Sequence, residues 1–241
     1  MLDISKFDSF FVANWKLNGS MSFVQEYLAK ISHKEISQDR KCVVICPPFI
    51  FVEKFKIDGL FLGAQNCTNY QKGAYTGEIS ANMLKNLGCS YCIIGHSERR
   101  NIFNEKNETI KEKVSMCIKE NIIPILCIGE NIKEKEENLT KEIIKKQIEE
   151  CLPNLSNSKN TIIAYEPIWA IGSGKKPNNN EIFEIHKYIK KNNKSLNFKV
   201  LYGGSVNSTN SKDIINLDCV DGLLIGGASL KIEEFNKIIK S

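Results

Sequence analysis

Short apolar runs recur along the whole chain, and this repetition limits the possible folds more than any other feature of the sequence. Longer segments separate the runs, and several runs are apolar at successive positions instead of alternating. Such runs are typical of strands that are covered on both faces in a parallel sheet. The strands we predict are Phe10–Ala13, Cys42–Cys46, Leu60–Ala64, Tyr91–Ile94, Ile122–Ile128, Thr161–Tyr165, Lys199–Tyr202 and Gly222–Ile225.

The segments between the expected strands carry apolar residues at the spacing of amphipathic helices. Asn178, followed three residues later by Glu181, has the pattern of a capping box and predicts the start of a helix. The two clearest apolar stripes are Ile182, Ile185, His186 and Ile189, and Leu139, Ile143, Ile144 and Ile148.

Eight strands that alternate with about eight helices in about 250 residues predict an α/β protein with a closed (β/α)8 barrel, or TIM barrel. No break in composition marks a second domain, so we expect a single domain over residues 1–241. The alternative is an open doubly wound sheet, but no G-x-G-x-x-G turn follows the first strand.

Charge and hydropathy argue against a nucleic-acid-binding, membrane or secreted protein. The 33 basic and 28 acidic residues give a net charge of +5 and are interleaved along the expected helices, which favours solvated helix faces over a nucleic-acid surface. No apolar run approaches the roughly 18 residues of a membrane span, and the first residues lack a signal-peptide core. We expect a soluble cytoplasmic protein without a membrane partner.

The cysteines indicate the redox compartment. Nine is an odd number, so a complete disulfide framework is impossible and a reducing compartment is expected. Cys89 and Cys92 have C-x-x-C spacing, but no second pair with ligand spacing accompanies them. We therefore expect small buried side chains and no metal site.

Candidate catalytic residues follow three of the expected strands, so a barrel would bring them together at one rim. Asn14 and Lys16 follow the first strand, His96 the fourth and Glu166 the sixth. Glu166 lies among apolar residues, and partial desolvation is expected to raise its pKa and make it a useful base. The glycine-punctuated segment 172–175 behind it is expected to form a lid.

His96 precedes a segment that resembles a first helical turn, and a helix N-terminus disfavours imidazolium. We therefore expect a neutral His96, whereas His186 on its apolar stripe is expected to be structural. Asn14 and Lys16 are expected to alternate as in a strand and so to point to the same side. The Lys16 ammonium would then face the rim.

Glycine-rich turns follow the last three strands: Gly172-Ser173-Gly174, Gly203-Gly204-Ser205 and Gly226-Gly227-Ala228-Ser229. Glycine lets backbone N–H groups approach an anion, and barrels often bind phosphate with the loops after strands seven and eight. The turns predict a phosphorylated substrate.

These motifs resemble the triosephosphate isomerase family along nearly the whole chain, from Ala13–Gly19 through Gly73–Ser80 and Cys127–Glu130 to Ile225–Leu230. The resemblance implies interconversion of dihydroxyacetone phosphate and glyceraldehyde 3-phosphate through an enediolate, a step of glycolysis and gluconeogenesis, without a cofactor. The implied roles are a base (Glu166), a neutral acid (His96), a cation (Lys16), substrate orientation (Asn14), phosphate binding (Gly172, Ser205, Gly226, Gly227) and support of the site (Glu98).

The resemblance also implies a homodimer in which the loop around Thr76 enters the partner.

In the family, two hydrogen bonds typically latch the closed lid, and here they would join Ser205 to Gly174 and Tyr202 to residue 177. Pro177 has no N–H, so only the hydrogen bond between Ser205 and Gly174 is possible. Ser173 is the other departure from the family pattern, because it occupies a lid position where threonine is common.

Two alternatives to an isomerase remain open. One is another phosphate-binding barrel enzyme, such as a synthase or an aldolase, and the other is an inactive phosphate-binding barrel. An aldolase would need a Schiff-base lysine inside the barrel, whereas Lys16 is the only obvious lysine beside a strand at the rim. An inactive barrel would be expected to lack Glu166, His96 or Lys16.

Overall fold

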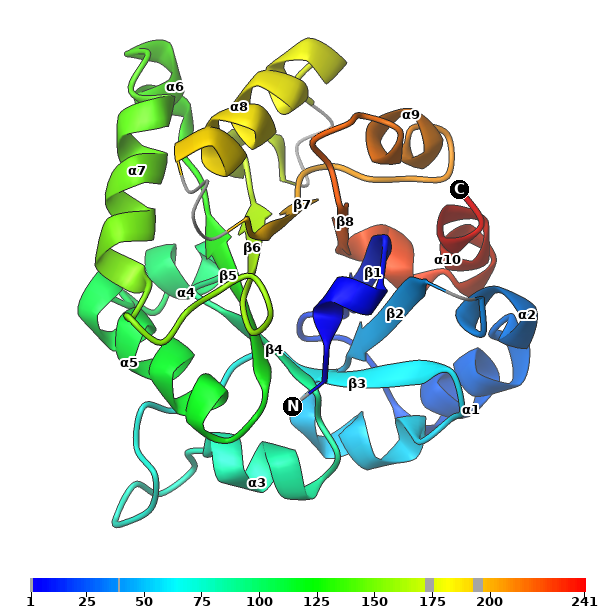
Figure 1. Ribbon diagram of the computed structural model, residues 1–241. Coiled ribbons are helices and arrows are strands. Elements are labelled where there is room, and N and C mark those ends of the chain that lie inside the picture. The colour runs from blue at the N-terminus through cyan, green and yellow to red at the C-terminus, as the bar shows by residue number, and fades with distance from the viewer. Residues whose placement is uncertain (1, 39, 172–175, 193–196) are drawn as a thin grey trace.

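Eight parallel strands close into a barrel in which each strand pairs with its neighbours in sequence order (Figure 1). The computed structural model describes residues 2–38, 40–171, 176–192 and 197–241. β1 pairs with both β2 and β8, which closes the sheet. The strands are β1 Ser9–Asn14, β2 Lys41–Cys46, β3 Leu60–Ala64, β4 Tyr91–Ile94, β5 Ile123–Ile128, β6 Ile162–Tyr165, β7 Lys199–Tyr202 and β8 Gly222–Ile225.

The sequence prediction of the strands is confirmed, with differences of one residue at some ends. Every strand is buried along nearly its whole length, because the barrel interior covers one face and the helices cover the other. In β1, for example, Phe10 and Val12 belong to the inner core whereas Phe11 and Ala13 pack outward. Burial on both faces explains why the runs are apolar at successive positions.

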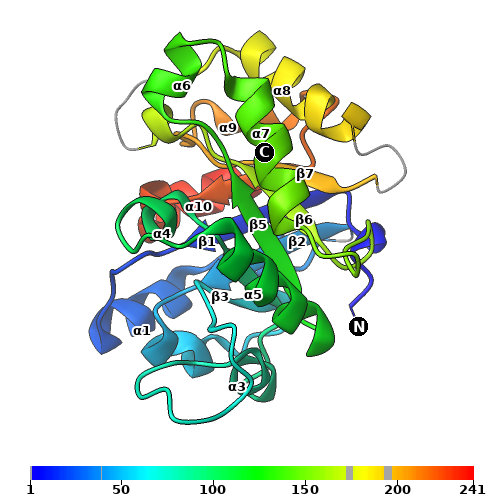
Figure 2. The same cartoon turned by 90° about the vertical axis from the view of Figure 1, so that its left-hand side faces the viewer.

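Helices surround the barrel on its outside (Figures 1 and 2). Within the described part of the chain the α-helices are α1 Met21–Lys30, α2 His33–Ile36, α3 Ala81–Asn86, α4 Ser97–Asn101, α5 Asn107–Lys119, α6 Ile132–Glu136, α7 Thr140–Cys151, α8 Asn179–Asn192, α9 Ser211–Ile215 and α10 Ile232–Ile239. Short 3-10 helices occupy Ile4–Lys6, Phe49–Phe55, Ile168–Ala170 and Gly227–Leu230.

The start of α8 confirms the predicted capping box. The Glu181 N–H donates to Asn178 Oδ1 at 2.9 Å, and the Asn178 N–H donates to Glu181 Oε2 at 2.8 Å. These two bonds satisfy backbone donors that the helix itself leaves free. The apolar stripe of α8 faces the core as expected, with Ile182, His186 and Ile189 buried.

Two further features bear on function. The loop between β3 and α3, which contains Thr76, extends beyond the ring of helices (Figure 1). No helix in the described ranges is long and apolar enough to cross a membrane.

Candidate active site

A cavity of about 330 Å³ opens at the carboxyl ends of the strands and contains the residues that the sequence singled out. Glu166, His96, Lys16 and Asn14 all line it, together with the glycine turns after β7 and β8. The structure therefore brings together side chains from loops that follow β1, β4 and β6, as the barrel topology requires.

Glu166 comes directly after β6 and is only 2% exposed. Its Oε1 lies 3.1 Å from His96 Nε2, and its Oε2 accepts a hydrogen bond of 3.0 Å from the Ser97 N–H. Both oxygens of a buried carboxylate are thus engaged, as burial demands. The Glu166 N–H in turn donates to Ile128 O at 2.7 Å and anchors the residue on β5.

Two glycines leave the space that Glu166 occupies. A Cβ at Gly129 would collide with the carbonyl oxygen of Glu166, and one at Gly203 would lie 2.9 Å from Glu166 Cγ. A residue with a side chain could replace either glycine only if the backbone or the carboxylate moved. The two glycines after β5 and β7 therefore position the carboxylate.

His96 is the N-cap residue of α4, and its Nδ1 accepts the Glu98 N–H at 3.2 Å. An accepting Nδ1 carries no proton, so the neutral imidazole holds its hydrogen on Nε2, which points at Glu166. The predicted helix start beyond His96 is confirmed. The geometry arranges one ring nitrogen as a donor toward the cavity.

The expected pKa directions of both residues are wrong for this arrangement. Burial alone would raise the pKa of Glu166, but attraction to His96 and hydrogen bonds from His96 and Ser97 outweigh burial and lower it. Burial alone would likewise lower the pKa of His96, but the Glu166 carboxylate outweighs it and raises that pKa. Sequence reasoning included the desolvation and the helix terminus but not the direct contact between the two residues.

The Lys16 side chain lines the cavity, but its backbone conformation differs from the prediction. β1 ends at Asn14, and Lys16 adopts a left-handed backbone with φ of 53° instead of continuing the strand alternation. Such a conformation costs roughly 1–3 kcal/mol in a residue other than glycine. Asn14 Oδ1 holds it by accepting the Lys16 N–H at 3.1 Å, and Gln65 Nε2 donates to Lys16 O at 2.9 Å.

Glu98 contacts Lys16, and the supporting role that the resemblance implies for Glu98 stays a prediction. Lys16 Nζ lies 2.6 Å from Glu98 Oε1. The Lys16 side chain is 26% exposed, so its ammonium stays accessible from the cavity while the carboxylate holds it. Gln65, which sequence reasoning missed, precedes Asn66-Cys67 and has no motif that could have marked it.

The glycine turns after β7 and β8 border the same cavity as Glu166 and His96. Gly226 and Gly227 line the cavity, and a Cβ at Gly227 would meet nothing within 4 Å. Ser205 also lines the cavity, and its hydroxyl donates to Ala170 O at 2.5 Å. Gly226 is followed by a four-residue 3-10 helix, not a longer α-helix. Gly172 and the lid segment 172–175 lie outside the described residues.

Glu130 at the end of β5 is a buried carboxyl that sequence reasoning did not assign. Its Oε1 accepts hydrogen bonds from Trp169 Nε1 at 2.8 Å and from the Tyr165 hydroxyl at 3.2 Å. Burial raises the pKa of Glu130. The three residues tie the 3-10 helix after Glu166 to the barrel, and so fix the segment that leads into residue 172.

A larger cavity of about 410 Å³ adjoins the first one on the side of α3 and α4. Lys16, His96 and Glu98 border it, as does the loop around Thr76 through its residues Gly77 and Glu78. Its volume exceeds that of the first cavity, but it lacks Glu166 and the glycine turns, so we place the chemistry in the smaller one.

The fold and the site together define a (β/α)8-barrel enzyme equipped for acid–base chemistry. A model of the triosephosphate isomerase family matches residues 9–241. The triosephosphate isomerase of Buchnera aphidicola subsp. Cinara cedri is 46% identical over 95% of this chain and 96% of its own. That of Francisella philomiragia is 39% identical over 95% and 94%.

A solved structure agrees with these relatives. The crystal structure of triosephosphate isomerase from Bartonella henselae matches with a TM-score of 0.87 and 34% identity, covering 96% of this chain and 98% of that one. The chain therefore belongs to the triosephosphate isomerase family and is an aldose–ketose isomerase.

Proposed function

We propose that this chain interconverts dihydroxyacetone phosphate and glyceraldehyde 3-phosphate with Glu166 as the base and His96 as its acidic partner. The observation that carries the assignment is the pair of groups in one cavity: a carboxylate 3.1 Å from an imidazole Nε2. The isomerisation moves a proton between two neighbouring carbons, and it needs a base at carbon and a donor at oxygen. The two groups fill these roles without a cofactor.

The reaction begins when the Glu166 carboxylate removes a proton from the carbon beside the carbonyl. Negative charge then develops on the carbonyl oxygen, where the His96 Nε2–H donates a hydrogen bond and Lys16 Nζ supplies a positive charge. His96 gives its Nε2 proton to that oxygen and takes the hydroxyl proton from the neighbouring oxygen, so the negative charge of the enediolate moves to the second oxygen. Glu166 then returns its proton to the neighbouring carbon, the new carbonyl forms at the second oxygen, and both the carboxylate and the neutral imidazole are restored. Glu166 and His96 contact each other in this structure, so the substrate must insert between them.

Asn14 and the glycine turns would orient the substrate. Asn14 is 5% exposed and its Oδ1 also holds the Lys16 backbone, so it fixes the cation relative to the rim. Gly226, Gly227 and Ser205 line the part of the cavity that would bind the phosphate. Gly172 would join them when the lid covers the site. Exclusion of water strengthens these interactions and protects the enediolate.

The assembly we propose is a homodimer in the cytoplasm. Large apolar side chains are exposed around the 410 Å³ cavity: Leu17, Phe49 and Phe103 are 96%, 43% and 62% exposed. A second copy would cover them, with its Thr76 loop inserted into that cavity beside Lys16. The stacked rings of Tyr70 and Tyr75, whose centroids are 3.7 Å apart, would stiffen the inserted loop.

A coupled assay tests the activity. Purified protein is given glyceraldehyde 3-phosphate, and dihydroxyacetone phosphate is measured by its reduction with a nicotinamide-dependent dehydrogenase. We expect turnover that needs no added metal and that persists in a chelator. Failure to isomerise either triose phosphate would overturn the proposed function.

A further inference from the structure

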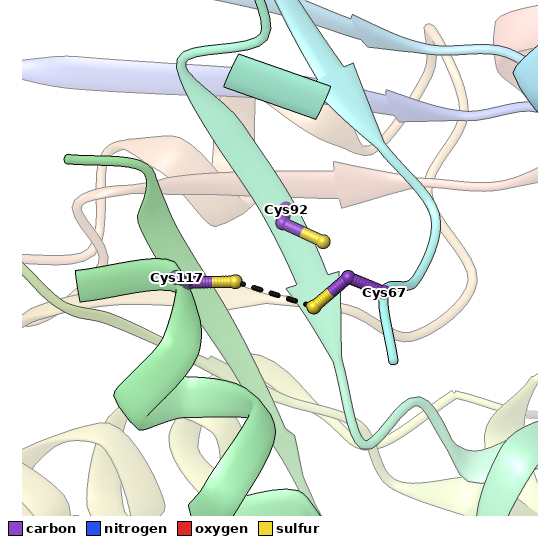
Figure 3. Close-up of side chains that lie close together, drawn as sticks. All are labelled: Cys67, Cys92 and Cys117. Atoms are coloured by element: carbon purple, nitrogen blue, oxygen red, sulfur yellow. Dashed lines mark hydrogen bonds between the residues drawn. The ribbon is translucent and has the colours of Figure 1, made fainter. Parts of the chain in front are cut away.

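Three cysteines that are far apart in the sequence meet in the core between the barrel and α5 (Figure 3). Cys67 lies in the loop after β3, Cys92 in β4 and Cys117 in α5. The Cys67 and Cys117 sulfurs are 3.6 Å apart, and all three sulfurs lie within 4.8 Å of one another. We refer to these three residues as the thiol trio. Each is a free cysteine and is buried.

The geometry points to the thiol trio as a binding site for one thiophilic monovalent cation, Cu(I). With metal–sulfur bonds of about 2.3 Å, three sulfurs around one ion lie about 4 Å apart. The trio is close to that spacing already, so small rotations of the side chains would complete it. Soft thiolate ligands select Cu(I) and zinc over the hard cations that prefer oxygen.

The number of ligands distinguishes between these two metals. Structural Zn²⁺ is almost always held by four protein ligands in a tetrahedron. Among the described histidine, cysteine and acidic residues, only the thiol trio forms a group of three or more potential ligand atoms, and no fourth joins it. The site is buried in an apolar core, so water is a poor fourth ligand. Three soft ligands without a fourth favour Cu(I).

A metal requires deprotonated ligands, so binding must displace the thiol protons. A hydrogen bond from Cys117 lowers the pKa of Cys67, whereas that hydrogen bond raises the pKa of Cys117 and burial raises the pKa of Cys92. Lys113, which is 5% exposed, carries a buried positive charge that acts on both Cys67 and Cys117. Lys113 Nζ lies 2.5 Å from Glu105 Oε1, so the trio faces a paired cation and not a free positive charge. Binding would release the thiol protons to solvent.

An entry path leads to the trio from the rim. Cys67 borders the 410 Å³ cavity, along with its neighbours Asn66 and Thr68. Cys67 is only 1% exposed, so an ion would reach its sulfur during a local opening at the edge of this cavity and would then pass to the other two sulfurs by ligand exchange. This cavity is the one in which we place the partner's loop, so loading should be done with dilute protein left to equilibrate.

The first test is copper retention. Purified full-length protein is loaded anaerobically with Cu(I) and then challenged with a chromophoric Cu(I) chelator, and bound copper is counted per chain. We expect one ion per chain in the parent. Cys92→Ala and Cys117→Ala should each bind at least about tenfold more weakly, because even loss of a residue behind a ligand costs 10–100-fold.

Cys89→Ala is the matched control, since Cys89 is a buried thiol near Cys92 that lies outside the trio. It should retain one ion per chain with unchanged affinity. Isomerase activity without metal should be the same in all variants, which shows that each one folds. The melting temperature should rise with Cu(I) in the parent and in Cys89→Ala but not in Cys117→Ala.

Three results would overturn the inference. These are a parent that keeps no copper against the chelator, a Cys117→Ala variant that keeps as much as the parent, and a parent that binds Zn²⁺ in preference to Cu(I). None of them would affect the proposed isomerase activity, because the trio does not line the cavity that contains Glu166.

Discussion

At the scale of single residues, the contact between Glu166 and His96 decides the electrostatics of the site. The contact raises the pKa of His96 and lowers the pKa of Glu166, in each case against the effect of burial. A substrate that separates them removes this mutual stabilisation. Desolvation by the substrate and the closed lid would then make the carboxylate more basic.

The first prediction concerns the base. Glu166→Gln should lower kcat by at least about 10³-fold, because the amide cannot accept the carbon-bound proton. KM should barely change, since Lys16 and the phosphate turns remain intact. Steady-state kinetics in both directions provide the measurement. Activity within tenfold of the parent would exclude Glu166 as the base.

His96→Gln should be milder than Glu166→Gln. A glutamine amide can still donate a hydrogen bond toward the developing oxyanion, so part of the electrostatic stabilisation survives. The same kinetic assay compares the two variants at one pH. A greater loss of kcat in His96→Gln than in Glu166→Gln would mean that proton transfer by the imidazole, and not hydrogen bonding, dominates.

At the scale of elements, the site depends on the loops that follow strands. The left-handed backbone of Lys16 is held by Asn14, the last residue of β1, which accepts its N–H, and by Gln65, which follows β3 and donates to its carbonyl. The 3-10 helix after β6 is tied to β5 through Glu130 and Trp169. Rigid strands thus define the positions from which irregular loops present the functional groups.

The lid latch gives a prediction at this scale. The Tyr202 hydroxyl is buried and has no hydrogen-bond partner among the described residues, and Pro177 offers no N–H. Ser205 already donates to Ala170 O, just before the lid. We expect Tyr202→Phe to cost less than about 1 kcal/mol in kcat/KM and Ser205→Ala to cost more.

The comparison is decisive because both substitutions remove only a hydroxyl. Values of kcat/KM for the two variants, measured with the same substrate, give the two free-energy losses. If the loss for Tyr202→Phe equals or exceeds that for Ser205→Ala, the tyrosine hydroxyl has another partner when the lid closes. The proposed latch through Ser205 would then be wrong.

At the scale of the whole molecule, assembly is the first question. The exposed apolar residues beside the 410 Å³ cavity predict a homodimer. Light scattering should therefore give about twice the 27.3 kDa mass of the chain. A monomer that is fully active at micromolar concentration would contradict this expectation.

The stability of the fold should depend on pH through His186. Burial lowers the pKa of His186 to about 4, and its Nδ1 lies 3.3 Å from Cys219 O. The pKa is near 6.5 when the chain is unfolded. As the pH falls below that value the unfolded chain binds the proton first, so stability is lost between about 6.5 and about 4.

Between pH 7.5 and pH 5 the parent should lose about 2 kcal/mol of unfolding free energy through this residue. Urea denaturation at one protein concentration measures the loss, and His186→Phe should lack that part of it. Carboxyl groups with a lowered pKa, such as Glu166, affect stability mainly below about pH 5, and they do so equally in the parent and in the His186→Phe variant. An equal loss in the parent and the variant would show that another group titrates.

The barrel could be predicted from the sequence because its signals are local. A strand buried on both faces must be apolar at successive positions, and a capping box spans only four residues. Once the strands are known, the topology brings Asn14, His96 and Glu166 to one rim. The family motifs at the strand ends then indicate the chemistry.

Only the tertiary structure decided what depends on contacts between distant residues. Ser97 and Glu166 are 69 positions apart, and their hydrogen bond helps to lower the pKa that burial alone would raise. The left-handed backbone of Lys16 depends on Gln65, and the thiol trio joins three cysteines that share no spacing motif. Charges and thiols respond to neighbours in space, and a linear pattern records only neighbours in sequence.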